Sequence, residues 1–279
     1  MHGRHSIRMK NLISRNNPKI KQIHHLLRQR KQRTESGLYV VEGIRHVGEA
    51  CAAQATVEYI CYAPDMLSSD FALQLVREQS DLGTHCYPVE KEVFADLSNK
   101  DNPQGILAVV HQPHWQLDNL SVENFNWGVA LVAPQDPGNI GSILRTIDAV
   151  GARGLLLLDD PANSQFCADP YHPSSVRASM GAIFWYPVIS TNFMDFVNWA
   201  GAQGHHIYGT SAHASLDYRT VKKYESPLIL LMGSEREGLT PEQSAACELL
   251  VRLPMNGRVT SLNLAVATGV MLYAISNNL

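Results

Sequence analysis

The sequence predicts an α/β protein with two domains, and three observations support this prediction. The chain has 279 residues, 45% of them hydrophobic, whereas a typical domain has roughly 100 to 200 residues. Short apolar runs alternate with segments of helical periodicity along the chain. In the second half these runs do not alternate with polar residues, as in central parallel strands covered on both faces. We therefore expect a small N-terminal α/β domain and a C-terminal domain in which helices cover both faces of a parallel sheet.

The first domain is expected to span residues 1–112 and to begin with a basic amphipathic helix. The apolar residues of this helix recur at helical spacing, at Ile20, Ile23, Leu26 and Leu27. Six basic residues surround them and form its expected outer face: Lys19, Lys21, Arg28, Arg30, Lys31 and Arg33. Strands are then expected at Leu38–Val41, Val57–Cys61 and Ile106–Val110, with helices over residues 43–52 and 71–77.

Residues 113–127 are expected to be a linker, because this stretch lacks a sustained period and contains polar and turn-forming residues. The second domain, residues 128–279, follows it. Five buried strands are expected there, at Val129–Ala133, Gly154–Leu158, Ile207–Thr210, Leu228–Met232 and Leu249–Leu253. Helical patterns separate these strands, which is the chain order of a parallel sheet.

The charges of the chain are unevenly distributed. Residues 1–34 contain ten basic residues and no acidic one, whereas the rest of the chain contains 13 basic and 26 acidic residues. Clustered Lys and Arg gain affinity for polyanions by releasing the counterions that phosphates condense. RNA or DNA is therefore one expected partner of this basic segment. Two other interpretations stay open on charge alone, namely a solvated helix face or tail and a transit peptide.

Cysteine, histidine and hydropathy patterns argue against several other classes of protein. The five cysteines are widely spaced and include no Cys-x-x-Cys pair, so neither a disulfide framework nor a zinc site is expected. The twelve histidines show no metal-ligand spacing such as His-Glu-x-x-His, and we expect no metal. The sequence has no apolar run of membrane-spanning length and no signal-peptide core. We expect a cytoplasmic protein with reduced thiols and no membrane association.

Three of the expected strands end in loops rich in Gly, Asn or Ser, and ligands bind at the carboxyl ends of strands in open α/β sheets. The first loop and its helix span residues 134–152, where Asn139 is a candidate N-cap. Arg145 lies roughly 140° around this helix from the apolar Ile140, at about 100° per residue. It is therefore expected to point away from the core, either into a cleft or toward Asp148 in an ordinary surface ion pair.

The second loop contains Gly233, Glu235 and Gly238 directly after a buried strand. Glycines at this place can serve the turn alone, but a glutamate between them is less easily explained as a solvated surface acid. Thr240 and Pro241 then carry the signature of a helix start, as the cap and the first helical residue.

The third loop precedes the C-terminal helix. No charged side chain occurs from Val259 to the C-terminus, so this helix is apolar almost all round and is expected to be buried. Small residues allow close packing against another helix, of this chain or of a second subunit: Ala265, Ala267 and Gly269. Ser261 and Asn263 lie at the helix start, expected near Leu262, where they either cap the helix or bind a polar ligand.

The three loops together resemble the motifs of a known family. In chain order they read DPGNIGSILR (136–145), GSEREGL (233–239) and LPMNGRVTSLN (253–263). This set is similar to that of the SpoU, or TrmH-like, branch of the SPOUT RNA methyltransferases. In the first domain, NPKIKQIHHLLRQRKQR and GLYVVEGIRHVGEA are similar to the substrate-binding domain of members that act on ribosomal RNA, which has the small α/β fold of certain ribosomal proteins. The resemblance extends from about Asn11 to Asn277.

The resemblance implies an enzyme that methylates a ribose 2′-hydroxyl of RNA with S-adenosylmethionine. It further implies a deep trefoil knot in the second domain, and a homodimer with its active sites at the subunit interface. Large-subunit (23S) ribosomal RNA is the favoured substrate, because a first domain of this kind indicates structured ribosomal RNA. The alternatives are a transfer RNA substrate and a non-catalytic RNA-binding or ribosome-assembly factor.

The resemblance also implies site residues, position by position. The cofactor is expected to contact Gly233, Leu253, Met255 and Leu262, with Thr210 and Ser211 as further contacts. The catalytic positions of the family correspond to Asn139, Arg145, Glu235, Ser261 and Asn263, with no departure at any of the five. RNA contacts are expected from the six basic residues of the first helix.

Arg145 is the position that the family assigns to activating the 2′-hydroxyl. Because an arginine is effectively always protonated in proteins, it is a poor candidate for a literal base. We therefore expect Arg145 to hold the adjacent phosphate and to stabilise the negative charge that develops on the 2′-oxygen. Asn139 and Asn263 would then orient Arg145 and the ribose, while Ser261 and Glu235 hold the loops.

Overall fold

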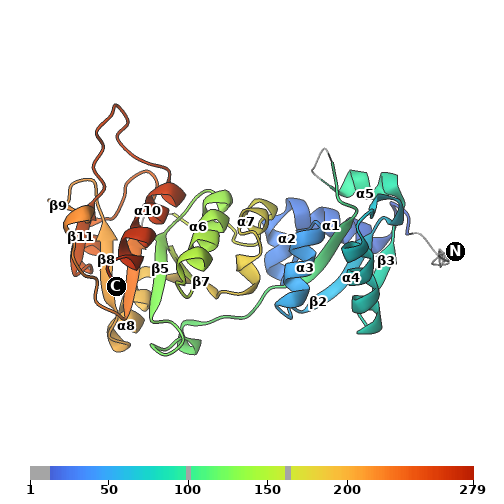
Figure 1. Cartoon of the computed structure of the whole chain (residues 1–279), viewed down its shortest axis with the longest axis horizontal. Helices are drawn as coiled ribbons and strands as arrows, with labels where there is room; N and C mark the ends of the chain where they lie inside the picture. Colours follow the sequence, from blue (N-terminus) through green and yellow to red (C-terminus); the bar gives the residue numbers. More distant parts are fainter. Residues whose placement is uncertain (1–12, 99–101, 161–164) are drawn as a thin grey trace. The chain divides into compact units, whose positions relative to one another are not determined.

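The computed structural model describes residues 13–98, 102–160 and 165–279, and Figure 1 shows the chain coloured along its sequence. These residues form two compact units. The first contains the residues up to Pro113 together with Tyr171–Pro173, and the second contains His114–Pro170 and Ser174–Leu279. The start of the basic segment, including Asn11 where the family resemblance begins, lies outside the described residues.

The first unit is built on a four-stranded sheet in the order β1-β4-β2-β3. Its strands are β1 (Leu38–Glu42), β2 (Val57–Tyr62), β3 (Cys86–Pro88) and β4 (Ile106–His111). β4 is antiparallel to β1 and β2, and β3 is parallel to β2. Its helices are α1 (Pro18–Arg28), α2 (Arg30–Ser36), α3 (Ile44–Ala52), η1 (Pro64–Met66), α4 (Asp70–Asp81) and α5 (Lys91–Leu97). The three strands expected from the sequence are all present, and β3 is an additional short one.

The single basic helix expected near the N-terminus is two helices. Asn17 caps α1 by accepting a hydrogen bond from the Lys19 N–H at 2.9 Å. Gln29 is extended, with φ −121° and ψ 114°, and so separates α1 from α2. Arg33 on α2 is only 2% exposed, and its guanidinium donates to the Leu26 carbonyl in the last turn of α1. The prediction that Arg33 lies on the outer face is wrong, because its side chain satisfies a carbonyl that the end of α1 leaves free.

The second unit contains a seven-stranded sheet in the order β7-β6-β5-β10-β8-β11-β9, and each pair of neighbouring strands is parallel. Its strands are β5 (Trp127–Val132), β6 (Leu155–Asp159), β7 (Val188–Asn192), β8 (His206–Thr210), β9 (Leu216–Asp217), β10 (Leu228–Met232) and β11 (Leu249–Arg252). β5 and β10 are buried along their full length, as predicted for central strands.

Helices cover both faces of this sheet, as predicted (Figure 1). On one face α6 (Pro137–Val150) packs against α10 (Leu264–Ser276). On the other face α8 (Phe193–Ala202) buries Phe196 and Trp199 against β5. The shorter helices are η2 (Leu117–Asn119), α7 (Pro173–Ala178), η4 (Ala182–Phe184), η5 (Tyr218–Thr220) and α9 (Pro241–Ala245). Among the described helices, none combines the length and the apolarity needed to cross a membrane.

The segment expected as a linker packs on the second unit. Residues from His114 onward group with that unit, and β5 starts at Trp127 within the expected linker. Leu120 and Phe125 are buried in the core beside α8, at 5% and 0% exposure. The apolar residues of this segment recur without a helical or strand period, so the sequence pattern does not predict that the segment packs against a domain.

Helix α10 differs from its prediction in two ways. It begins at Leu264, two residues after the expected start, because Asn263 is its N-cap. One face is buried against the unit, including Met271 and Leu272, but Val266 and Tyr273 are 52% and 55% exposed. The expectation that this helix is buried all round is therefore wrong for the chain by itself, since one apolar side has no cover within the described residues.

Candidate active site

Three loops leave the same edge of the seven-stranded sheet. They follow β5, β10 and β11, and the parallel register of these strands through β8 gives them a common carboxyl edge. Ligands of open α/β sheets bind at such an edge. The residues that the sequence singled out in the three loops can therefore be located relative to one another.

The loop after β5 places Asn139 in the first turn of α6. Asp136 is the N-cap, because its side chain accepts a hydrogen bond from the Gly138 N–H at 2.7 Å, and Pro137 follows it. The prediction that Asn139 caps this helix is wrong. A preceding aspartate takes that role, which leaves the buried Asn139 amide free for other loops.

Asn139 joins the three loops through its side-chain amide. Asn263 Nδ2 donates to Asn139 Oδ1 at 2.9 Å, and Asn139 Nδ2 donates to Glu235 Oε1 at 3.3 Å. The Glu235 carboxylate also accepts from the Gln135 N–H at 3.3 Å. We call Asn263, Asn139 and Glu235 the amide chain.

The direction of the amide chain follows from the cap of α10. Asn263 Oδ1 accepts from the N–H groups of Ala265 and Val266 at 2.9 and 3.3 Å. Its Nδ2 is then the group that faces Asn139, which must present its own oxygen and turn its N–H₂ toward a carboxylate that only accepts. Each amide therefore has one orientation that satisfies both of its neighbours.

The loop after β10 is a tight turn that requires glycine at its start. Ser234 and Gly238 exchange two backbone hydrogen bonds, at 3.1 and 3.0 Å. A Cβ at Gly233 would lie 2.2 Å from the Gly238 carbonyl carbon, so no larger residue fits. Thr240 caps α9 and accepts from the Gln243 N–H at 3.2 Å, which confirms the predicted helix start.

Two of the predicted catalytic residues lie apart from the amide chain. Arg145 is exposed on α6 and points away from the core, as its spacing predicts. Asp148 accepts from the Tyr186 hydroxyl at 2.9 Å, and the described residues include no ion pair between Arg145 and Asp148. Ser261 is exposed in the loop before α10, and no hydrogen bond to it occurs in the described part of the chain. The structure thus brings together Asn139, Glu235 and Asn263, but not these two.

An open groove of about 550 Å³ lies beside the amide chain, between α6, the first turn of α10 and helix α7. Asn139 and Asn263 line it. Sequence analysis missed its other polar lining residues, Asp136, Ser142, Thr146, Ser174 and Arg177. Ser142 and Thr146 follow Asn139 at helical spacing, so a polar stripe on α6 was a usable signal. Arg177 comes from a separate segment that contains no motif, so the sequence offers no signal for it.

The predicted cofactor positions lie around the same edge. Gly233 is buried, Thr210 Oγ1 donates to Met232 Sδ at 3.5 Å, and Ser211 Oγ accepts from the His213 N–H at 3.2 Å. In the loop after β11, Leu253 and Met255 are half-buried and Leu262 is 39% exposed. This edge of the sheet therefore combines hydroxyl groups, main-chain polar groups and accessible apolar side chains.

The basic residues of the first unit are not equivalent. Lys21, Arg28 and Arg30 are exposed. Lys19 Nζ lies 4.1 Å from the ring centroid of Tyr59, which is a cation–π contact, and Lys31 forms an exposed ion pair with Glu35 at 3.7 Å. Arg33 is buried, as described above. Lys21 and Arg28 are seven residues apart on α1 and so lie on one face of it.

Both units match known families and proteins. Residues 126–273 match the SpoU rRNA methylase family, and residues 17–108 match the MRM3-like substrate-binding domain. A Streptomyces viridochromogenes protein named 23S rRNA (uridine(2479)-2′-O)-methyltransferase is 32% identical over 94% of this chain and 90% of its own length. The Bacillus subtilis 23S rRNA (guanosine(2553)-2′-O)-methyltransferase RlmP is 30% identical over 95% and 98%. A crystal structure of an AdoMet-bound rRNA methyltransferase from Sinorhizobium meliloti matches with a TM-score of 0.84 and 34% identity over 95% and 96%.

The two hydrogen-bonding roles of Asn263 can be separated by substitution. We predict that Asn263→Ala lowers the free energy of unfolding by about 1 kcal/mol, because the cap of α10 is lost. Asn263→Asp should lose less, since a carboxylate still accepts from Ala265 and Val266 at a helix N-terminus. Both variants should shift the NMR signals of the Asn139 side-chain amide, because neither donates to its oxygen. Urea denaturation measures the first effect.

Two results would contradict this assignment. Equal destabilisation by the two substitutions would show that the carbonyl oxygen of Asn263 does not cap α10. Unchanged Asn139 amide signals in both variants would show that Asn263 does not hold Asn139.

Proposed function

Because the chain belongs to the SpoU rRNA methylase family, we propose that it methylates a ribose 2′-hydroxyl of 23S ribosomal RNA with S-adenosylmethionine as the methyl donor. The observation that carries this proposal is the amide chain, which links the three family motifs at one edge of the sheet. A purely RNA-binding protein has no need of that linkage. Two of the relatives that match nearly the whole chain are named as 23S rRNA 2′-O-methyltransferases, which favours this substrate over transfer RNA.

The residues around the carboxyl edge fit S-adenosylmethionine. Leu253, Met255 and Leu262 offer accessible apolar surface for the faces of an adenine ring. The turn that begins at Gly233 is closed by the two backbone hydrogen bonds between Ser234 and Gly238, and Thr210 and Ser211 add hydroxyls. We propose that these six residues hold the cofactor, which supplies an electrophilic methyl group when it is bound.

The protein must then place a ribose 2′-oxygen and stabilise charge on it. The groove beside the amide chain receives the target nucleotide, and the Asn139 and Asn263 side chains on its wall orient the ribose. Glu235 orients the Asn139 side chain by accepting its hydrogen bond. The Ser261 hydroxyl is exposed in the loop before α10. Arg145 holds the adjacent phosphate and stabilises the developing negative charge on the 2′-oxygen, while Arg177 adds a second cation at the groove.

A second copy of the chain completes this arrangement. Arg145 is exposed and stands apart from the amide chain of its own subunit, so it can serve a neighbouring site. The uncovered side of α10 borders a groove of about 540 Å³ lined by Tyr218, Val266 and Tyr273. We propose a homodimer in which α10 is covered by the partner and the active sites lie at the interface.

The parts of the chain take separate roles in this proposal. Residues 128–279 form the methyltransferase domain, with a deep trefoil knot as in the family, and residues 113–127 connect it to residues 1–112. The first domain, with the fold of certain ribosomal proteins, docks the RNA through α1 and the basic segment before it. We propose that the protein acts in the cytoplasm.

We predict that Arg145→Ala lowers methylation by at least about 100-fold, because the electrostatic stabilisation of the 2′-oxygen is lost. Affinity for S-adenosylmethionine should stay within a few fold, since Arg145 is not one of the six residues that we assign to the cofactor. Labelled S-adenosylmethionine is incubated with unmodified ribosomal RNA or transfer RNA, and mass spectrometry of the nuclease digest identifies the product. Calorimetry gives the cofactor affinity.

Arg145→Lys is the matched control for charge. It should be inactive as well, because an ammonium ion cannot replace the planar fork of a guanidinium. Loss of cofactor binding in Arg145→Ala would contradict the role given to this residue. Base methylation, or no methylation of either RNA by the unmodified protein, would contradict the proposed reaction.

We further predict that replacing Lys21 and Arg28 together by alanine weakens RNA binding. The slope of the logarithm of the binding constant against the logarithm of the salt concentration should become smaller in magnitude by about one to two. The thermal stability should not change, because both side chains are exposed. The contrasting variant is Arg33→Ala, which should lower the free energy of unfolding by about 1 to 3 kcal/mol. Fluorescence anisotropy at several salt concentrations and thermal melting measure the two effects. An unchanged salt slope in the double variant would exclude α1 from the RNA interface.

A further inference from the structure

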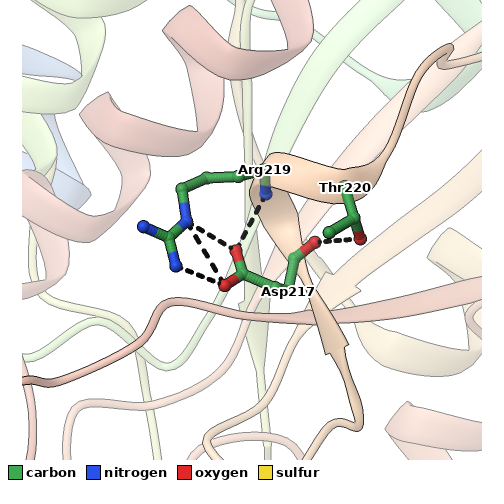
Figure 2. Close-up of polar contacts among 3 residues, drawn as sticks. All are labelled: Asp217, Arg219 and Thr220. Atoms are coloured by element: carbon green, nitrogen blue, oxygen red, sulfur yellow. Dashed lines mark hydrogen bonds and ion pairs between the residues drawn. The ribbon is translucent and has the colours of Figure 1, made fainter.

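A compact turn lies beside the expected cofactor loop, and its geometry is set by Asp217 and Arg219 (Figure 2). The Asp217 carboxylate accepts from the Arg219 N–H at 3.0 Å, from Nε at 3.0 and 3.2 Å, and from Nη2 at 2.6 Å. Thr220 Oγ1 donates to the Asp217 carbonyl at 2.7 Å. These contacts close β9 into η5, and Arg219 holds the pKa of Asp217 down at about 2.

One side of this turn holds the strand before the loop. β9 pairs in parallel with β11, with Leu216 opposite Val251 and Asp217 opposite Arg252. Arg252 is the last residue of β11, and its positive charge acts on Asp217 as well. Asp217, which forms the ion pair, is therefore also the residue that pairs with the end of β11.

The other side of the turn holds the helix after the loop. η5 packs against α10, and Tyr218 lines the same groove as Gly269 and Tyr273 of that helix. Backbone hydrogen bonds between successive turns join a helix into one unit, so a contact at its middle also constrains the position of its N-terminal end, which Asn263 caps. The turn therefore touches both elements that the loop of residues 253–263 connects.

The loop itself has few means of holding its shape. In the described part of the chain, residues 253–262 make no hydrogen bond, and the first residue of the loop region that does is Asn263. Val259 is 63% exposed. Leu253, Met255 and Leu262, which we assign to the cofactor, thus depend on where the two ends of the loop are held.

We propose that Asp217 and Arg219 are positioning residues for cofactor binding, which act by holding the two ends of the loop 253–263 at the spacing that S-adenosylmethionine requires. This inference rests on the proposed function, which supplies the cofactor. An exposed ion pair alone contributes little to stability. The side chains of Asp217 and Arg219 are 20% and 60% exposed. Their bidentate contact, however, also closes the turn that contacts the elements at both ends of the loop.

The test is a titration of the full-length protein with S-adenosylmethionine by calorimetry. We expect Asp217→Asn and Arg219→Ala each to raise the dissociation constant about three- to tenfold, and Arg219→Lys to raise it less. The matched control is Lys223→Ala, because Lys223 and Glu225 form an exposed ion pair at the same sequence separation, at 3.0 Å, with no part in the turn. Lys223→Ala should bind the cofactor like the unmodified protein.

A second readout does not need the cofactor. Trypsin cleaves after Arg258 in the middle of the loop, and this cleavage should be faster in Asp217→Asn and Arg219→Ala than in Lys223→Ala. Equal cofactor affinity and equal cleavage in all variants overturn the proposal. If the unmodified protein itself fails to bind S-adenosylmethionine, the proposed function is wrong, while the cleavage rates still decide whether Asp217 and Arg219 hold the loop.

Discussion

The candidate site depends on one constraint, which is that the carbonyl oxygen of Asn263 is used to cap α10. That oxygen accepts from two N–H groups of the helix, so the amide nitrogen of Asn263 must find its acceptor elsewhere. Asn139 provides the acceptor, and its own nitrogen then faces Glu235. A requirement of helix capping thus becomes a directional link between three loops, the first of which lies 96 and 124 residues before the other two in sequence. Without the parallel strands that bring their carboxyl ends to one edge, the three side chains could not meet.

Two features that lie outside the amide chain support the proposed second copy. The amide chain and the groove beside it belong to one chain, whereas Arg145 is exposed on α6 and one apolar side of α10 is uncovered. In the proposed homodimer, a second copy covers α10 and also supplies a cation to the site. Arg177 adds charge at the groove, and we propose that the turn at Asp217 holds the loop that binds the cofactor.

Much of this could be predicted from the sequence, because the determining signals are local. Apolar runs located the central strands, and glycine, proline and threonine marked the loop after β10. The errors share a different cause. Arg33 and Asn139 were misplaced because a neighbouring residue, Gln29 or Asp136, ended or capped the helix. α10 was judged from its composition, which cannot say whether a helix is covered by its own chain or by another. Arg177 and the ion pair of Asp217 depend on contacts between distant segments, which periodicity does not record.

The central claim is that Asn139 and Asn263 act as one unit in methyl transfer. A double-mutant cycle on kcat/KM for RNA methylation tests it most directly, with Asn139→Ala, Asn263→Ala and the double variant. We expect the double variant to be scarcely slower than the worse single variant, which corresponds to a coupling energy of at least about 1 kcal/mol. If the two losses multiply instead, the residues act independently, and the amide chain is not what organises the site.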